Sequence, residues 1–184
     1  MQNDFALFLS ALNFSAGKHR HQRRKDEQAS PYINHPIEVA NVLWTIGDVS
    51  DTITIIGALL HDTIEDTNTT PEEIRTNFGK DVLALVLEVS DNKNLPKHDR
   101  KAIQIREAPY LSKRAKQLKL ADKICNISDI VNYPPRDWSK QRKIDYLEWA
   151  YNVIDGLRGT NIKLETHFDA LLAEGRRKLA LEKG

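Results

Sequence analysis

The chain has 184 residues, of which 40% are hydrophobic and 29% charged, and its formal net charge at pH 7 is +1. These values predict one soluble, globular domain over residues 1–184 and give no reason to expect general affinity for nucleic acid or membranes. The single cysteine, Cys125, excludes an intramolecular disulfide framework and a thiolate zinc cluster. With no signal-like start and no apolar run of about 20 residues, we expect a cytoplasmic protein.

The first third of the chain predicts two helices separated by a basic loop. Asp4 is positioned to cap a first helix that ends near Gly17. Residues 18–34 break the helical pattern with a cluster of basic side chains and a polar turn, which could be simply a solvated loop. A second helix is expected from His35-Pro36 to Gly47, with proline in its first turn.

The next segment, residues 51–62, is ambiguous by propensity. Its β-branched run, Ile53-Thr54-Ile55-Ile56, would suit a buried strand. No other stretch offers a convincing partner strand, and Asp51 can cap a helix, so we interpret the segment as helical.

The remainder of the chain also shows helical patterns. Thr70-Pro71 is a strong helix start, Asp81–Val89 indicates a core helix, and Asn92–Lys97 indicates a loop. A long basic helix, bent or restarted at Pro109, is expected to run from Arg100 towards Ile130, followed by helices over about 139–155 and 160–180. The sequence therefore predicts an all-α, single-domain protein.

The most informative stretch follows the apolar run that ends at Leu60. His61 and Asp62 are adjacent, and Glu65 and Asp66 follow one helical turn later, on the same side if the helix continues. Buried carboxylates need a counter-charge, and a divalent cation would supply it. The alternative is a helix end that turns polar at the surface.

Two further residues could complete a metal site. His35 stands at a helix start, where it could instead be a cap or surface residue, and Asp122 lies in an apolar helical stretch, where it could instead pair with Lys119 or Lys123. Two imidazoles and two carboxylates suit a borderline ion such as Mn²⁺, Fe²⁺ or Zn²⁺, and the lack of thiolates disfavours structural zinc.

A His, then His-Asp, then a distant Asp is similar to the pattern of the HD phosphohydrolase superfamily. Four longer sequence motifs resemble the hydrolase domain of RelA/SpoT proteins, above all the stand-alone Mesh-type small alarmone hydrolases. These motifs are Arg23-Arg24-Lys25, Pro31-Tyr32-Ile33-Asn34-His35-Pro36, Ala58-Leu59-Leu60-His61-Asp62-Thr63-Ile64-Glu65-Asp66-Thr67 and Lys119-Leu120-Ala121-Asp122-Lys123-Ile124-Cys125-Asn126. The resemblance spans essentially the whole chain. Since a synthetase or regulatory domain would not fit beside it in 184 residues, we expect neither.

The resemblance implies an all-helical HD fold with a central metal site, one Mn²⁺ per chain held by His35, His61, Asp62 and Asp122. It implies hydrolysis of the 3′-pyrophosphate of ppGpp and pppGpp to GDP or GTP and pyrophosphate, which removes a stringent-response signal. Glu65 and Asp66 match the positions that orient and activate the attacking water.

The resemblance also implies a substrate pocket lined by Arg24, Lys25 and Asn126, with looser matches at Arg142 and Tyr146. A strongly anionic substrate calls for a basic rim, for which the candidates are Lys25, Lys97, Arg142 and Lys143. The last three could equally lie on a solvated face, and Arg24 could stack on the base.

Two other functions remain open at this stage. The same centre could serve a phosphatase of another 2′- or 3′-phosphorylated nucleotide such as NADPH, since the pocket selects the leaving group. A catalytically silent nucleotide-binding module would be expected to lack part of the metal set, which is complete here. The sequence allows a homodimer without requiring one.

Overall fold

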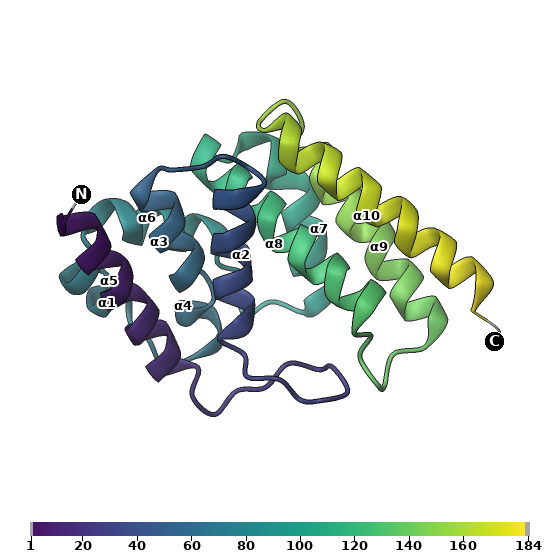
Figure 1. The fold of residues 1–184 in the computed structure, drawn as a ribbon, viewed down its shortest axis with the longest axis horizontal. Coiled ribbons are helices and arrows are strands. Elements are labelled where there is room, and N and C mark those ends of the chain that lie inside the picture. Colours follow the sequence, from purple (N-terminus) through teal and green to yellow (C-terminus); the bar gives the residue numbers. More distant parts are fainter. Residues whose placement is uncertain (1, 183–184) are drawn as a thin grey trace.

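The computed structural model describes residues 2–182, with side chains from Asp4 onward, as an array of helices (Figure 1). The helices are α1 (Gln2–Lys18), α2 (Asn34–Thr45), α3 (Thr52–Leu60), α4 (Thr63–Asp66), α5 (Pro71–Phe78), α6 (Lys80–Val89), α7 (Lys97–Glu107), the 3₁₀ turn η1 (Ala108–Tyr110), α8 (Lys113–Asn132), α9 (Lys140–Asp155) and α10 (Ile162–Leu181). Within residues 2–182 the only β-type pairing is an isolated antiparallel bridge between Arg23 and Pro31. The all-α prediction is therefore confirmed.

Capping side chains begin several helices where the sequence predicts them. Asp51 accepts a hydrogen bond from the Thr54 backbone N–H at 3.0 Å, so the β-branched run forms helix α3 and not a strand. Thr70 and Glu73 form a reciprocal capping box at the start of α5.

Two local expectations need correction or refinement. Helix α1 begins at Gln2, so Asp4 lies in its first turn, where a carboxylate favours the helix dipole, and is not its N-cap. The long basic helix is divided, because Pro109 falls in the turn η1 and Ser112 caps a new helix, α8.

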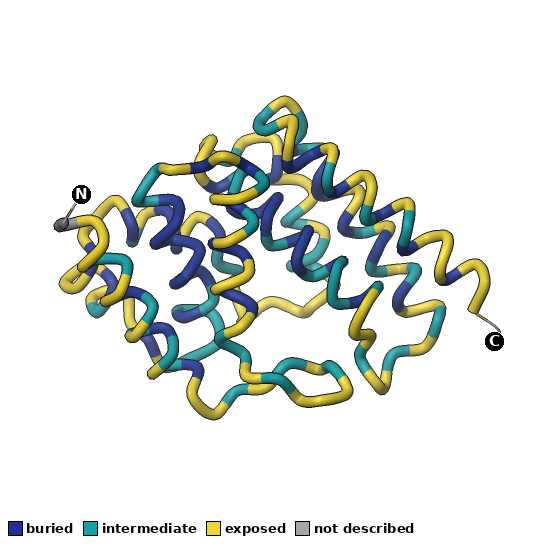
Figure 2. The backbone as a smooth tube through the Cα atoms, viewed as in Figure 1, coloured by how far each residue is buried: buried dark blue, intermediate teal, exposed yellow. Residues whose placement is uncertain are grey.

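Helices α3 and α8 form the centre of the hydrophobic core (Figure 2). Helix α3 contacts α1, α2, α6 and α8, and every one of its residues from Thr54 to Leu60 is buried. At Gly57 a Cβ atom would lie 2.5 Å from Leu85 Cδ2 of α6, so any larger residue would force the buried Leu85 side chain to shift. The C-terminal end of α3, with His61 directly after it, therefore points into the middle of the molecule.

Helices α9 and α10 pack along α8 and extend the molecule away from α1 (Figure 1). Among the residues that the structure describes, no helix combines the length and apolar character needed to cross a lipid bilayer.

Candidate active site

The pair His61-Asp62 lies at a break between two helices. Helix α3 ends at Leu60 and α4 begins at Thr63, whose hydroxyl donates a hydrogen bond to the Leu60 carbonyl oxygen at 2.6 Å. The sequence placed Glu65 and Asp66 on the same side as His61 if one helix continued through Asp66, but the helix is interrupted after Leu60. Glu65 and Asp66 lie instead on the short helix α4, which still brings both to the same cavity as His61.

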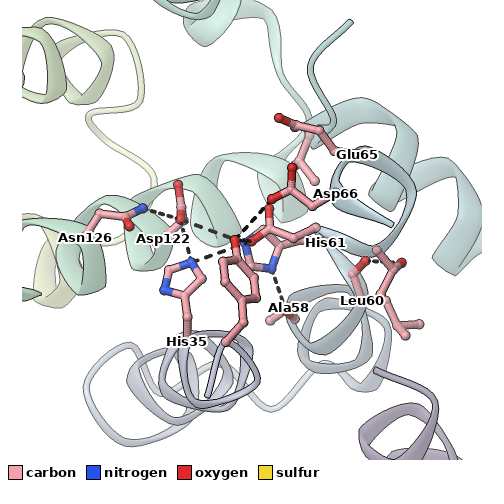
Figure 3. A network of polar contacts seen from close by, with 12 residues as sticks. His35, Ala58, Leu60, His61, Glu65, Asp66, Asp122 and Asn126 are labelled. Atoms are coloured by element: carbon pink, nitrogen blue, oxygen red, sulfur yellow. Dashed lines mark hydrogen bonds and ion pairs between the residues drawn. The ribbon is translucent and has the colours of Figure 1, made fainter. Parts of the chain in front are cut away.

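Helices α2 and α8 bring His35 and Asp122 to this break (Figure 3). His35 Nε2 lies 3.1 Å from Asp122 Oδ1 and 3.9 Å from Asp62 Oδ2. His61 Nε2 lies 3.1 Å from Asp62 Oδ2 and 3.9 Å from Asp122 Oδ1. Donor atoms from three segments that are distant in sequence therefore converge, at the wall of an inner cavity of about 200 Å³.

The donor atoms suit a divalent cation. His61 Nδ1 donates to the Ala58 carbonyl oxygen at 2.7 Å, because a carbonyl can only accept, and this leaves the Nε2 lone pair directed towards the carboxylates. Within the described chain, buried His61 Nε2 has no hydrogen-bond partner. A lone pair facing carboxylate oxygens is repulsive unless a cation or a proton lies between them. The residues present therefore fit a metal ion.

The charges around these donors depend strongly on one another. Burial opposes charge on His61, but the Asp62 carboxylate outweighs it and raises the pKa of His61 to about 9. Burial likewise opposes ionisation of Asp122, but Lys123 and His35 hold its pKa well below the usual range. Burial also opposes ionisation of Asp62, but His61 outweighs it and lowers the pKa of Asp62. Both carboxylates are thus kept ionised, and a bound cation would replace the proton on His61.

A second layer of side chains orients the two carboxylates. The Tyr32 hydroxyl donates to Asp62 Oδ2 at 2.6 Å and to Asp66 Oδ2 at 3.3 Å, so it joins these two residues. Asn126 donates to Asp122 Oδ1 at 2.6 Å, and Lys123 donates to Asp122 Oδ2 at 2.7 Å. The sequence predicted no role for Tyr32, although Tyr32 lies in the motif Pro31-Tyr32-Ile33-Asn34-His35-Pro36. The position of a tyrosine in the sequence does not reveal where its hydroxyl points.

Glu65 and Asp66 both line the inner cavity, in different environments. Glu65 Oε2 accepts a hydrogen bond from the Asp91 backbone N–H at 2.9 Å, and Oε1 lies 3.2 Å from Lys93 Nζ. Burial raises the pKa of Glu65. Asp66 Oδ1 accepts from Lys93 at 2.5 Å, and Asp66 also borders the next cavity outward.

An outer cavity of about 400 Å³ adjoins the inner one, since Tyr32, Asp66 and Asn126 line both. Arg24, Lys25, Lys97 and Tyr146, all named from the sequence, border this outer cavity. The Arg24 guanidinium pairs with Asp129, donates to Asn126 Oδ1 at 3.2 Å, and lies 5.6 Å from the centre of the Tyr32 ring. The outer cavity thus combines cations with aromatic faces.

Two residues predicted for the basic rim do not line either cavity. Lys143 is buried and pairs with Glu182 Oε1 at 2.7 Å, so it is not a rim residue. Arg142 does not line the cavity itself, but its guanidinium lies 4.4 Å from the centre of the Trp138 ring, which does, so Arg142 lies beside the cavity edge. Neighbouring residues on a helix point about 100° apart, so Arg142 and Lys143 could not share one face.

Comparison with known proteins identifies the family to which this chain is similar. The chain matches the HD domain family over residues 11–150. Guanosine-3′,5′-bis(diphosphate) 3′-pyrophosphohydrolase MESH1 of Xenopus tropicalis is 51% identical over 174 residues, covering 95% of this chain and 97% of that protein. The protein of the same name from Homo sapiens is 48% identical over 165 residues, covering 90% and 92%.

A solved structure described as a metazoan ortholog of SpoT that hydrolyzes ppGpp and plays a role in starvation responses superposes with a TM-score of 0.90. It is 44% identical and covers 95% of this chain and 97% of that one. With both sequence and fold shared along almost its whole length, the chain belongs to the HD domain family, and within it to the MESH1 group.

Proposed function

We propose that this chain is a metal-dependent hydrolase that removes the 3′-pyrophosphate of ppGpp and pppGpp, yielding GDP or GTP and pyrophosphate. One observation carries the proposal: His35, His61, Asp62 and Asp122 converge beside Glu65 and Asp66 at the inner end of a cation-lined pocket. Relatives about half identical to the chain are named as enzymes of this activity.

We propose one Mn²⁺ per chain, held by His35, His61, Asp62 and Asp122, with Fe²⁺ or Zn²⁺ as alternatives that the same donors accept. Such an ion supplies a lowered pKa for the attacking water and neutralises charge on a phosphoryl oxygen. The buried, hydrogen-bonded setting of His61 keeps its ring in one orientation for this purpose.

The chemical step then needs a base and two proton transfers. The water oxygen forms a bond to the phosphorus attached to O3′ of the nucleotide, and the bond between that phosphorus and O3′ breaks. One water proton passes to the carboxylate of Glu65 or Asp66, and O3′ takes up a proton, from that carboxyl group or from solvent, as GDP or GTP leaves. Burial raises the pKa of Glu65, which strengthens its carboxylate as a base for this transfer.

The outer cavity would hold the rest of the nucleotide. Arg24 and Tyr146 present planar faces at its wall, and a guanidinium or aromatic face can stack on a purine base. Lys25 and Lys97 are exposed cations at the same cavity, suited to the 5′-phosphates. Asn126 connects the two cavities, because it hydrogen-bonds Asp122 and accepts from Arg24.

A side-by-side turnover assay of ppGpp, pppGpp and NADPH, with and without added Mn²⁺, tests the proposal. We expect Mn²⁺-dependent release of pyrophosphate from both alarmones, resolved chromatographically from orthophosphate. Orthophosphate release from NADPH without alarmone turnover would instead make the chain a nucleotide phosphatase, and alarmone binding without turnover would make it a binding module. Light scattering on the same sample measures whether the active species is a homodimer. Cys125, buried and unpaired, suits a reducing compartment, and we propose the cytoplasm.

A further inference from the structure

Lys119 differs from the other buried lysines of the described chain. Lys119, Lys123 and Lys143 are 8%, 4% and 7% exposed. Lys123 Nζ lies 2.7 Å from Asp122 Oδ2, and Lys143 Nζ lies 2.7 Å from Glu182 Oε1, so each ammonium group has a carboxylate partner. Among the described residues no carboxylate oxygen lies within 4.0 Å of Lys119 Nζ, whose hydrogen bond goes to the Val89 carbonyl oxygen at 3.1 Å.

A buried ammonium group without a counter-ion is costly, because it loses its hydration and gains no opposite charge in return. Val89 is the last residue of α6, and its carbonyl oxygen offers only the partial negative charge of a helix end. Burial and the neighbouring charge of Lys123 lower the pKa of Lys119, and the carboxylates of Asp122, Asp91 and Glu65 offset this only in part. Lys119 therefore lacks a direct ionic contact, which an anion from outside the chain can supply.

Lys119 lines the inner cavity together with the proposed metal ligands. The carboxylates that line this cavity each have a partner of their own. Asp62 Oδ2 lies 3.1 Å from His61 Nε2, Asp122 Oδ2 lies 2.7 Å from Lys123 Nζ, and Asp91 Oδ2 lies 3.6 Å from Arg100 Nη1. Glu65 and Asp66 lie 3.2 and 2.5 Å from Lys93 Nζ. Lys119 is thus the cavity-lining charge that the described chain leaves unpaired.

We propose that Lys119 binds the outer phosphate of a diphosphate leaving group and so makes the inner cavity selective for a 3′-diphosphate over a 3′-monophosphate. This inference rests on the proposed function, because the attacked phosphorus must lie beside His35, His61, Asp62 and Asp122. The phosphate beyond it must then occupy the remainder of the same cavity, where the Lys119 ammonium has two unused donors.

The test compares two substrates that differ by one phosphate: ppGpp and guanosine 5′-diphosphate 3′-monophosphate. In the Mn²⁺-loaded protein, Lys119→Gln is expected to lower kcat/KM for ppGpp by about 10- to 100-fold, the loss expected for one charge-assisted contact. The value for the monophosphate should change by less than about 3-fold. Lys119→Arg, which keeps the charge, should restore part of the preference for the diphosphate. Lys143→Gln is the matched control, a buried lysine outside the cavity, and should leave both values unchanged.

Equal losses of kcat/KM on both substrates, or no loss on either, would overturn the role of Lys119 while leaving the hydrolase proposal intact. A binding measurement that needs no turnover separates the two ideas further. Methylenediphosphonate, which cannot be hydrolysed, should raise the melting temperature of the Mn²⁺-loaded parent and of Lys143→Gln but not of Lys119→Gln. If ppGpp proves inert and this pattern still holds, the proposed function fails and the diphosphate subsite stands. If Lys119→Gln does not fold, an unchanged substrate ratio in Lys119→Arg, together with no shift of the parent by methylenediphosphonate, overturns the subsite.

Discussion

The hydroxyl of Tyr32 offers the sharpest test of how the site is held together. It donates to Asp62 Oδ2 at 2.6 Å and to Asp66 Oδ2 at 3.3 Å, so it joins a proposed metal ligand to a proposed base. Burial raises the pKa of Tyr32 far above its usual value, and the negative charge of Asp62 raises it further. The hydroxyl therefore remains protonated, and a donor, at any working pH. Tyr32→Phe removes this donor and keeps the ring.

The expected loss follows from these contacts. A hydrogen bond to a charged group contributes about 1.5–3 kcal/mol, and loss of a partner behind a metal ligand costs about 10- to 100-fold in metal affinity or activity. We therefore expect kcat/KM for ppGpp to fall by about 10- to 100-fold and the Kd for Mn²⁺ to rise about 10-fold. The ring should still stack on His19, 4.8 Å away between centroids, so the free energy of unfolding should fall by no more than the about 1.5–3 kcal/mol of the lost hydrogen bond.

Steady-state release of pyrophosphate gives kcat/KM, and equilibrium dialysis gives the Mn²⁺ affinity of the same preparations. Tyr110→Phe is the matched control, since Tyr110 is 86% exposed and lines neither cavity. If Tyr32→Phe binds Mn²⁺ as tightly as the parent and turns over ppGpp at the parental rate, the hydroxyl does not orient Asp62 or Asp66, and the second layer described above has no catalytic part.

Three further substitutions test the centre and the helix that leads into it. His61→Ala should abolish metal retention and turnover together, and activity surviving in metal-stripped variant protein would refute the ligand assignment. Glu65→Gln should retain Mn²⁺ in dialysis but slow kcat by about 10²-fold or more, whereas an unchanged kcat would move the base to Asp66. Gly57→Ala places a Cβ 2.5 Å from buried Leu85 Cδ2. The overpacking should outweigh the gain in helix propensity and lower the melting temperature by about 3 °C, measured by circular dichroism, and a rise would show that the core yields there.

Local signals in the sequence were enough to predict much of the fold. Asp51 and Thr70 cap helices because their side chains bond to backbone N–H groups three residues away, which is a property of the local sequence. The same signals misplaced the start of α1, because a helix can begin before a good cap when nothing prevents it. Hydrophobic runs alone did not distinguish helix from strand at residues 53–56; the absence of a partner strand did.

The site was harder to predict because its parts come from distant segments. His35 and Asp122 are separated by 87 positions. The residue pattern named them as possible ligands with other roles left open, and the resemblance to a family implied that they meet. Lys143 shows the opposite case: a basic residue beside Arg142 looked suitable for a rim, but the helical rotation between neighbours turned it towards Glu182. The role of Tyr32 depends on the position that the loop before α2 gives its hydroxyl, and the hydrophobic periodicity of the sequence does not predict loop conformation.

The spread of the proposed ligands over α2, the α3–α4 break and α8 has a consequence for the life of the protein in the cell. An ion held by all of them would act as a cross-link between segments that otherwise meet through packing and a few side-chain hydrogen bonds, and would stabilise the folded chain according to its free concentration. Scarcity of the ion would then reduce the amount of intact protein as well as the rate of each molecule, because unfolded chains are open to proteases. The supply of a trace metal would in this way govern how long an alarmone signal persists.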